Sequence, residues 1–207
     1  MTDLPPEANG AARGRGRLAG RRVVVVGAGT QVSDDPDAPV GNGRAISVLA
    51  AREGASVVCV DRSEDAAKET ADLITAEGGT AHVVVADVAE PEACGALVAA
   101  AEEQLGGIDG LVLNVGIGFG MRLEGTSVGA WDRTFAVNLR AHFLICQAAL
   151  PVLADESSVV FISSIAGLTP GSQMPAYDSS KAGLIGLCRH VALEGSRRTI
   201  RANVIAP

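Results

Sequence analysis

A chain of 207 residues is long enough to bury a sizeable core and corresponds to one domain. Its net charge of −7 argues against a general nucleic-acid binder, because such proteins are usually basic. No apolar run reaches the roughly 18 residues that a membrane span needs, and residues 1–10 carry acids and prolines where a signal peptide needs an apolar core. We therefore expect a cytoplasmic protein without nucleic-acid or membrane partners.

Residues 1–20 are rich in glycine, proline and arginine, which predicts a flexible leader before a single domain over residues 21–207. The arginines between Arg13 and Arg22 are interpreted as a solvated run rather than as a nucleic-acid or membrane contact.

The four cysteines lie far apart with no CxxC pair, and the three histidines are equally dispersed. This spacing favours reduced, buried thiols, and no metal centre is expected.

Strand and helix patterns alternate along the rest of the chain. The pattern predicts, in chain order, strand Val23–Val26, helix Ala45–Glu53, strand Ser56–Val60, helix Ser63–Glu77, strand His82–Val85, helix Pro91–Leu105, strand Leu111–Leu113, helix Val128–Leu153, strand Val159–Ile162, helix Tyr177–Glu194 and strand Ala202–Ile205. The helix over 128–153 is expected to be interrupted or kinked near Pro151. The alternation predicts a three-layer α/β/α domain with a doubly wound parallel sheet of the Rossmann type.

Three glycines suit a phosphate-binding turn between the first strand and the first helix. Gly27 directly follows the strand, and Gly41 and Gly43 open the helix, whose free N–H groups and dipole favour an anion. The glycines are unusually far apart, because the acidic insert Gln31–Pro39 lies between them. A glycine-rich loop without a ligand is the alternative interpretation. We expect the insert to turn its acids to solvent while the strand and the helix still meet.

Two strand ends carry acids that suit the adenosine half of a dinucleotide. Asp61 ends the second strand, where a carboxylate can bind ribose hydroxyls and repel a 2′-phosphate, so NAD is favoured over NADP. The neighbouring Arg62 weakens this preference, because arginine could pair with that phosphate. Asp87 and Val88, after the third strand, are placed to meet the adenine.

Tyr177 and Lys181 lie four residues apart on a predicted helix and therefore share one face. A nearby ammonium favours tyrosinate, and a tuned tyrosine can move the proton that accompanies hydride transfer at an alcohol carbon. Such a pair is common by chance on solvated helices. It gains weight because Ser164 and Asn114 follow strands at their carboxyl ends, where these sheets bind ligands, and Asn138 lies on the preceding long helix.

With these motifs in place, the chain resembles the classical short-chain dehydrogenase/reductase family from about Leu18 to Pro207. The resemblance implies that Asn138, Ser164, Tyr177 and Lys181 form a catalytic tetrad. In it, Ser164 would hydrogen-bond the substrate oxygen, and Tyr177 would act as the general acid/base. Lys181 would tune the tyrosine and hold the nicotinamide ribose, and Asn138 would position a relay water.

The same resemblance implies a set of cofactor-binding residues, namely Gly27, Gly41, Gly43, Asp61, Arg62, Asp87, Val88, Asn114, Gly116, Tyr177 and Lys181. Two departures from the family pattern stand out. Leu113 replaces the first asparagine of the family's NNAG segment, and the insert interrupts the glycine turn. The chain also stops at Pro207, so we expect a fragment that lacks the family's last strand and substrate lid.

The first hypothesis is an oxidoreductase that transfers a hydride between NAD(H) and a small alcohol or ketone, acting as a homodimer or homotetramer. The second is an NADPH-dependent reductase of 3-oxoacyl thioesters or ketones. A third, from another class, is a nucleotide-binding pseudoenzyme without catalysis. The intact tetrad argues against the third, because a pure binder needs neither Ser164 nor Tyr177.

Overall fold

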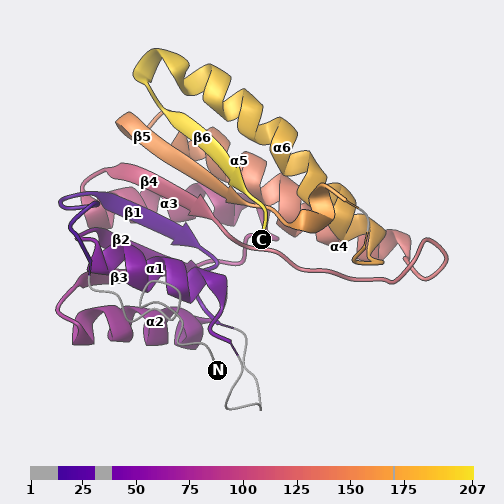
Figure 1. The fold of residues 1–207 in the computed structure, drawn as a ribbon, viewed down its shortest axis with the longest axis horizontal. Helices are drawn as coiled ribbons and strands as arrows, with labels where there is room; N and C mark the ends of the chain where they lie inside the picture. The colour runs from indigo at the N-terminus through magenta and orange to yellow at the C-terminus, as the bar shows by residue number, and fades with distance from the viewer. Residues whose placement is uncertain (1–13, 31–38, 170) are drawn as a thin grey trace, which may run out of the picture.

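The computed structural model describes residues 14–30, 39–169 and 171–207. Its centre is a parallel sheet with the strand order β3-β2-β1-β4-β5-β6 (Figure 1). The strands are β1 Arg22–Val26, β2 Ser56–Asp61, β3 Thr80–Val85, β4 Ile108–Leu113, β5 Leu153–Ile162 and β6 Arg201–Ile205. This order confirms the predicted doubly wound sheet. The order reverses between β1 and β4, and such a reversal opens a crevice at the carboxyl ends of the strands.

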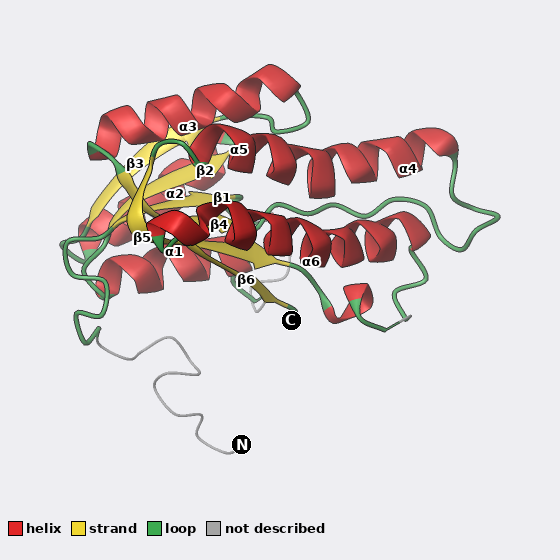
Figure 2. Ribbon diagram, turned by 90° about the horizontal axis from the view of Figure 1, so that it is seen from above, coloured by secondary structure: helices red, strands yellow, loops and turns green. Residues whose placement is uncertain are grey.

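Helices cover both faces of the sheet. They are α1 Asn42–Arg52, α2 Glu64–Ala76, α3 Pro91–Leu105, α4 Val128–Phe135, α5 Ala141–Ala149 and α6 Pro175–Gly195. Figure 2 shows α3 and α5 on one side of the sheet and α1 on the other. Side chains alternate along β1, so that Val24 and Val26 join the larger apolar core while Val23 and Val25 join the smaller one. The run of valines is therefore buried on both faces, as its composition predicts.

The prediction of one helix over 128–153 is wrong in two respects. The irregularity lies at Ala136–Arg140, which forms a π-helical turn between α4 and α5, and not near Pro151. The helix ends at Ala149, and Leu153 already belongs to β5. Pro151 follows the helix because a proline in its interior would lack an N–H donor and would clash with the preceding turn.

Other elements are longer than their apolar patterns suggest. β3, β4 and β5 each begin before the predicted residue, and α1 begins at Asn42 rather than at Ala45. α6 begins at Pro175, in the first turn where proline is tolerated. Among the described residues, no helix is long and apolar enough to span a membrane. Cys59, Cys94, Cys146 and Cys188 are buried, free thiols.

The folded part begins before residue 21. The backbone N–H of Leu18 donates to the carbonyl of Glu53 at 2.9 Å, which ties this stretch to the end of α1. Arg17 pairs with Glu53 at 2.7 Å, and Arg22 pairs with Asp109 at 2.7 Å. The sequence assigns these arginines to solvent. Instead, Arg17 and Arg22 attach β1 and the residues before it to α1 and β4.

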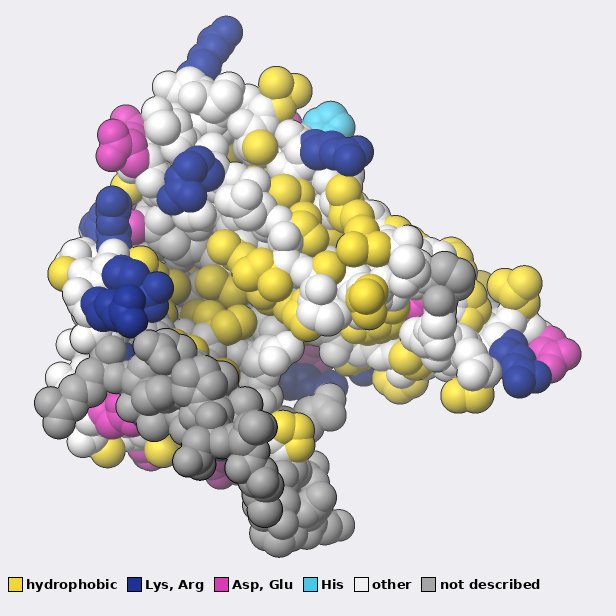
Figure 3. Space-filling view, viewed as in Figure 1, with side chains coloured by type: hydrophobic (Ala, Val, Ile, Leu, Met, Phe, Trp, Pro, Cys, Tyr) yellow, Lys and Arg dark blue, Asp and Glu magenta, His cyan; other side chains and the backbone are white. Residues whose placement is uncertain are grey.

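α4 and the first turns of α6 extend beyond the carboxyl ends of the strands (Figures 1 and 2). Seen from the side shown in Figure 1, hydrophobic side chains gather over the middle of the molecule, where the ribbon shows β4, β5 and β6 (Figure 3). Ile205, at the end of β6, is one of the exposed apolar residues, with about 51% of its surface accessible. The predicted site residues lie at this carboxyl end of the sheet.

Candidate active site

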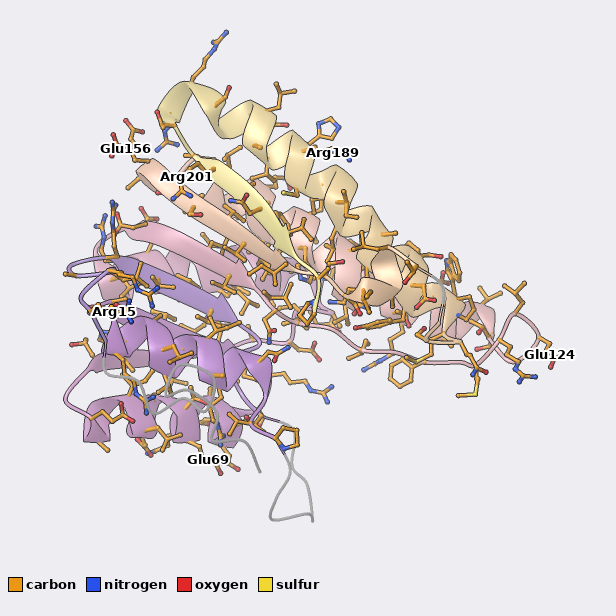
Figure 4. The ribbon with its side chains drawn as sticks, viewed as in Figure 1. Arg15, Glu69, Glu124, Glu156, Arg189 and Arg201 are labelled. Atoms are coloured by element: carbon orange, nitrogen blue, oxygen red, sulfur yellow. The ribbon has the colours of Figure 1, made fainter. Side chains whose placement is uncertain are left out.

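A cavity of about 540 Å³ opens at the carboxyl ends of β1, β2, β3 and β4. It includes seven of the residues that the sequence assigns to the cofactor: Gly27, Asp61, Arg62, Asp87, Val88, Asn114 and Gly116. Residues that the sequence does not single out also line it, among them Gly29, Thr30, Ser63, Ile117, Phe119 and Arg133. Glu156 and Arg201 lie at the opposite end of the sheet (Figure 4).

The glycine turn closes despite the insert. Gly27 has a φ of 83°, and a Cβ on Gly43 would lie only 1.7 Å from the Gly27 carbonyl oxygen, so the second residue of α1 must be a glycine. The backbone N–H of Gly41 donates to Thr30 Oγ1 at 3.1 Å. Gly41 and Gly43 therefore bring α1 against the end of β1 rather than lining the cavity. Residues 31–38 of the insert lie outside the described residues.

Asp61 is held by the glycine turn. Its Oδ2 accepts a hydrogen bond from the Gly29 N–H at 2.9 Å, and its Oδ1 accepts one from the Ser63 N–H at 3.1 Å. A Cβ on residue 29 would lie 2.9 Å from Asp61 Oδ2, so glycine is required for this contact. The sequence pattern did not single out Gly29 as a site residue, although its spacing of two residues from Gly27 could have indicated it.

Some of the other charged residues at this end of the sheet are bonded to neighbouring elements, and others line the cavity. Arg44 points toward α2, where its guanidinium donates to Glu69 at 2.6 Å and to Thr70 at 3.1 Å. Asp87 accepts a bond from the Ala89 N–H at 2.9 Å, which fixes the turn after β3. Arg62 lines the cavity, as does the unpredicted Arg133.

Asn114 joins β4 to the glycine turn. Its side-chain Nδ2 donates to the Gly27 carbonyl at 2.8 Å, and its backbone N–H donates to the Val26 carbonyl at 2.9 Å. The first asparagine that the family pattern contains is replaced here by the fully buried Leu113. The remaining asparagine therefore links the two strands that flank the crevice.

Asn138 lies in the π-helical turn and is completely buried. Its Oδ1 accepts a bond from the Ile117 N–H at 2.8 Å, and its Nδ2 donates to the Ile117 carbonyl at 2.8 Å and to Ser180 Oγ at 3.0 Å. One side chain thus connects the loop after β4 with α6. π-helical turns are rare and occur frequently at functional sites.

Lys181 is the central charge of the arrangement. It is 2% exposed, and its Nζ donates to the Ile162 carbonyl at 2.8 Å and lies 5.7 Å from the centre of the Tyr177 ring. Burial lowers the pKa of this lysine to about 8. A Cβ on Gly116 would lie 2.9 Å from Nζ, so the chain after β4 passes directly against the ammonium.

The two serines after β5 differ in their surroundings. Ser163 is buried, and its Oγ donates to the Lys181 carbonyl at 2.8 Å, which commits that hydroxyl to packing. Ser164 is half-buried, and its Oγ accepts a bond from the Ala166 N–H at 3.2 Å. Among the described residues the Ser164 hydroxyl donates to no protein group, so its proton is available to a ligand.

The residues present fit a dinucleotide. A glycine cradle that any side chain would fill lies beside a strand-end carboxylate, and the cavity extends from there to Gly116, which contacts the Lys181 ammonium. Apolar walls with a few fixed polar groups are typical of cofactor sites. Tyr177, Lys181, Asn138 and Gly116 lie together, and Ser164 is two residues past the carbonyl that Lys181 binds.

Comparison with known proteins supports this architecture. Residues 38–207 match the family model described as short chain dehydrogenase. A 2-(S)-hydroxypropyl-CoM dehydrogenase from Xanthobacter autotrophicus is 35% identical over 170 residues, which cover 81% of this chain and 66% of that protein. A 3beta-hydroxysteroid dehydrogenase from Eggerthella lenta is 35% identical over 92% of this chain and 70% of its own length. The chain thus spans about two thirds of these relatives.

A solved short chain dehydrogenase from Burkholderia cenocepacia, in complex with NADP, superimposes with a TM-score of 0.82 at 32% identity. The match covers 92% of this chain and 75% of that one. Sequence and structure therefore agree on one assignment that the site geometry had already suggested. The chain belongs to the short-chain dehydrogenase family.

Proposed function

We propose that this chain is a nicotinamide-dependent oxidoreductase that interconverts a small alcohol and its ketone or aldehyde, with Tyr177 as the general acid/base. The observation that carries the proposal is the buried Lys181 ammonium, which is anchored on the Ile162 carbonyl and lies beside the Tyr177 ring. Burying a charge is costly, and a folded protein retains it where the charge has a task. Stabilising tyrosinate during proton transfer is such a task.

The chain's own residues divide the work. When bound, the nicotinamide cofactor supplies or accepts the hydride. Gly27, Asp61, Asp87 and Asn114 are the residues that would hold it, along the cavity wall. The Ser164 hydroxyl donates a hydrogen bond to the substrate oxygen, and Tyr177 gives or takes the proton at that oxygen.

Asn138 acts mainly by positioning. Both protons of its amide are used by Ile117 and Ser180, and one lone pair of Oδ1 is used by the Ile117 N–H. Only the second lone pair of Oδ1 is left for the relay water that the family resemblance implies. Asn138 therefore fixes the loop after β4 against α6, and with it the surroundings of Lys181.

We propose NAD(H) rather than NADP(H) as the cofactor. Support comes from Asp61, whose carboxylate lies in the cavity wall, where it would repel a 2′-phosphate. The alternative, an NADPH-dependent reductase, is favoured by Arg62 on the same wall and by the NADP complex of a relative. Titrating both cofactors decides between them, because equal or reversed affinities would contradict the choice of NAD.

Turnover is tested by mixing the chain with NAD⁺ or NADP⁺ and a panel of primary, secondary and cyclic alcohols. We expect the absorbance of reduced nicotinamide to rise with at least one alcohol. Tight cofactor binding without turnover of any alcohol, or of any ketone in the reverse direction, would instead favour a nucleotide-binding protein without catalysis.

We further propose that the protein forms homodimers or homotetramers through the outer faces of α5 and α6. Phe143 on α5 is 47% exposed, Leu193 on α6 is 69% exposed, and a groove between the helices is lined by Cys146, Leu187 and Val191. Light scattering during size exclusion measures the mass directly. A monomer at micromolar concentration would contradict this assembly.

A further inference from the structure

Two strained residues hold each other across the catalytic end of the molecule. Among the described residues, four that are not glycine have left-handed backbones: Arg122, Glu156, Gln173 and Thr199, with φ between 56° and 63°. Side chains disfavour this conformation, so the surrounding structure must impose it. Arg122 and Gln173 are directly bonded, although they are 51 residues apart. The Arg122 N–H donates to the Gln173 carbonyl at 2.7 Å, and Arg122 Nε lies 3.4 Å from Gln173 Oε1.

Arg122 is pinned within the loop that joins β4 to α4. Thr126 Oγ1 donates to the Arg122 carbonyl at 2.7 Å, so both polar groups of the Arg122 backbone are engaged. Gly120 precedes it with a φ of 75°. The loop extends past the sheet, and Glu124 lies at its tip (Figure 4). A loop that reaches so far needs an external attachment, and Gln173 provides one.

Gln173 lies just before α6 and is equally fixed. Its neighbour Ser172 accepts a bond from the Met174 N–H at 2.9 Å through Oγ and donates to the Asp178 carboxylate. Met174 is the N-cap residue of α6, and Tyr177 is the third residue of that helix. The position of Gln173 is therefore transmitted to the first turn of α6.

The two loops also pack on each other beside the tyrosine. A Cβ on Gly118 would lie 2.8 Å from Met174 Sδ and 3.6 Å from Tyr177 Cδ2. Glycine at position 118 thus makes room for the Met174 side chain, which lies next to Tyr177. An unbranched thioether adapts well to apolar groups of differing shape.

We propose that the bond between Arg122 and Gln173 is a clamp that positions Met174 beside Tyr177, and that Met174 determines which alcohols fit there. The proposal rests on the proposed function. Arg122 and Gln173 are positioning residues, and Met174 is the residue that contacts the alkyl groups of the substrate. Arg122, Gln173 and Met174 do not line the cofactor cavity. Ile117 and Phe119 of the same loop do line it, so the effect of the clamp is assigned to the substrate because Met174 lies beside Tyr177.

The test compares two substitutions at one position. Arg122→Gly and Arg122→Pro both remove the guanidinium, but glycine keeps the N–H donor and accepts a positive φ, whereas proline allows neither. With NAD⁺ and either propan-2-ol or cyclohexanol, Arg122→Pro should raise KM about tenfold relative to Arg122→Gly, as expected for one lost hydrogen bond. The value of kcat and the Kd for NAD⁺ should change little. Met174→Ala should alter the ratio of kcat/KM between the two alcohols.

Hydrogen exchange supplies a second readout that does not need turnover. The amides of residues 117–124 and 171–176 should exchange faster in Arg122→Pro than in Arg122→Gly. Equal KM and equal exchange in the two variants would overturn the clamp, as would a parallel loss of NAD⁺ affinity in Arg122→Pro. If the wild-type chain oxidised neither alcohol, the proposed function would have failed on these substrates, and equal exchange would then overturn the clamp independently.

Discussion

At the scale of single residues, the proposed chemistry depends on one hydroxyl. Replacing Tyr177 with phenylalanine keeps the ring beside Lys181 and removes only the hydroxyl that is proposed to move the proton. We expect turnover to fall by about 10² to 10⁴, the usual contribution of a general acid or base. Cofactor affinity, measured by titration with NAD(H), should remain nearly unchanged. A variant that retained most of the wild-type rate would contradict the assignment of Tyr177.

Burial of the Lys181 ammonium should lower the free energy of unfolding. Its pKa is about 8 in the folded chain against 10.5 when exposed, a difference on the order of 3 kcal/mol at neutral pH that burial imposes. The hydrogen bond from Lys181 Nζ to the Ile162 carbonyl offsets only part of this cost. Lys181→Met should therefore unfold at a higher denaturant concentration than wild type at pH 7 while losing turnover.

The sign of this effect with pH follows from proton binding. Between pH 8 and 10.5 the unfolded chain binds the Lys181 proton more tightly than the folded chain does, so this lysine makes stability rise with pH. The advantage of Lys181→Met should shrink over that window. Denaturant titrations of both proteins at a series of pH values measure it, and a constant difference would show that Lys181 is not the cause.

Gly116 has no room for a side chain. A Cβ there would lie 2.9 Å from Lys181 Nζ and 3.2 Å from Cε, and the lysine is too buried to move aside freely. Gly116→Ala should displace the ammonium and lower kcat/KM by about 10², as small misplacements in active sites do. Gly95→Ala is the matched control, because nothing lies near its Cβ and alanine should stabilise α3 by about 0.5–1 kcal/mol. Equal kinetics for both variants would contradict the role of Gly116.

At the scale of elements, the ends of the glycine turn meet across the insert. A Cβ on Gly41 would lie 3.2 Å from Thr30 Cα, so the two residues are nearly as close as neighbours in a chain, whose Cα atoms are about 3.8 Å apart. Deleting residues 31–40 would join Thr30 to Gly41 and leave three residues between Gly27 and Gly41. We expect the shortened protein to fold and to bind NAD(H) as the full chain does. Circular dichroism checks the fold, and lost binding with the fold retained would show that the insert contacts the cofactor.

At the scale of the whole molecule, the approach to β1 is anchored by one carboxylate. The Arg17 side chain and the backbone N–H groups of Arg15 and Arg17 lower the pKa of Glu53 from 4.5 to about 2. Because the folded pKa is depressed, this contribution to stability is complete above about pH 4.5 and is lost as pH falls toward 2. Glu53→Gln should be less stable at pH 7, and its deficit should shrink through that acid window. Thermal unfolding at graded pH tests this, and an unchanged deficit at pH 2 would refute it.

The sequence alone determined the order of elements and the parallel sheet, and seven of the residues that it assigned to a cofactor line the cavity. Such features depend on local information, because valine runs such as Val23–Val26 favour a strand buried on both faces, and residues at strand ends necessarily gather at one edge of the sheet. The spacing of Tyr177 and Lys181 likewise predicted a shared helix face. The family motifs are likewise local, because each is read from a short stretch of residues.

Only the tertiary structure decided the rest. The π-helical turn carries Asn138, whose side chain bonds to Ile117 and to Ser180, partners 21 and 42 residues away. The clamp between Arg122 and Gln173 and the requirement for Gly29 beside Asp61 also depend on loops that are distant in the chain. Periodicity reports which face of an element is buried, whereas contacts between loops depend on how the packed elements place their ends in space.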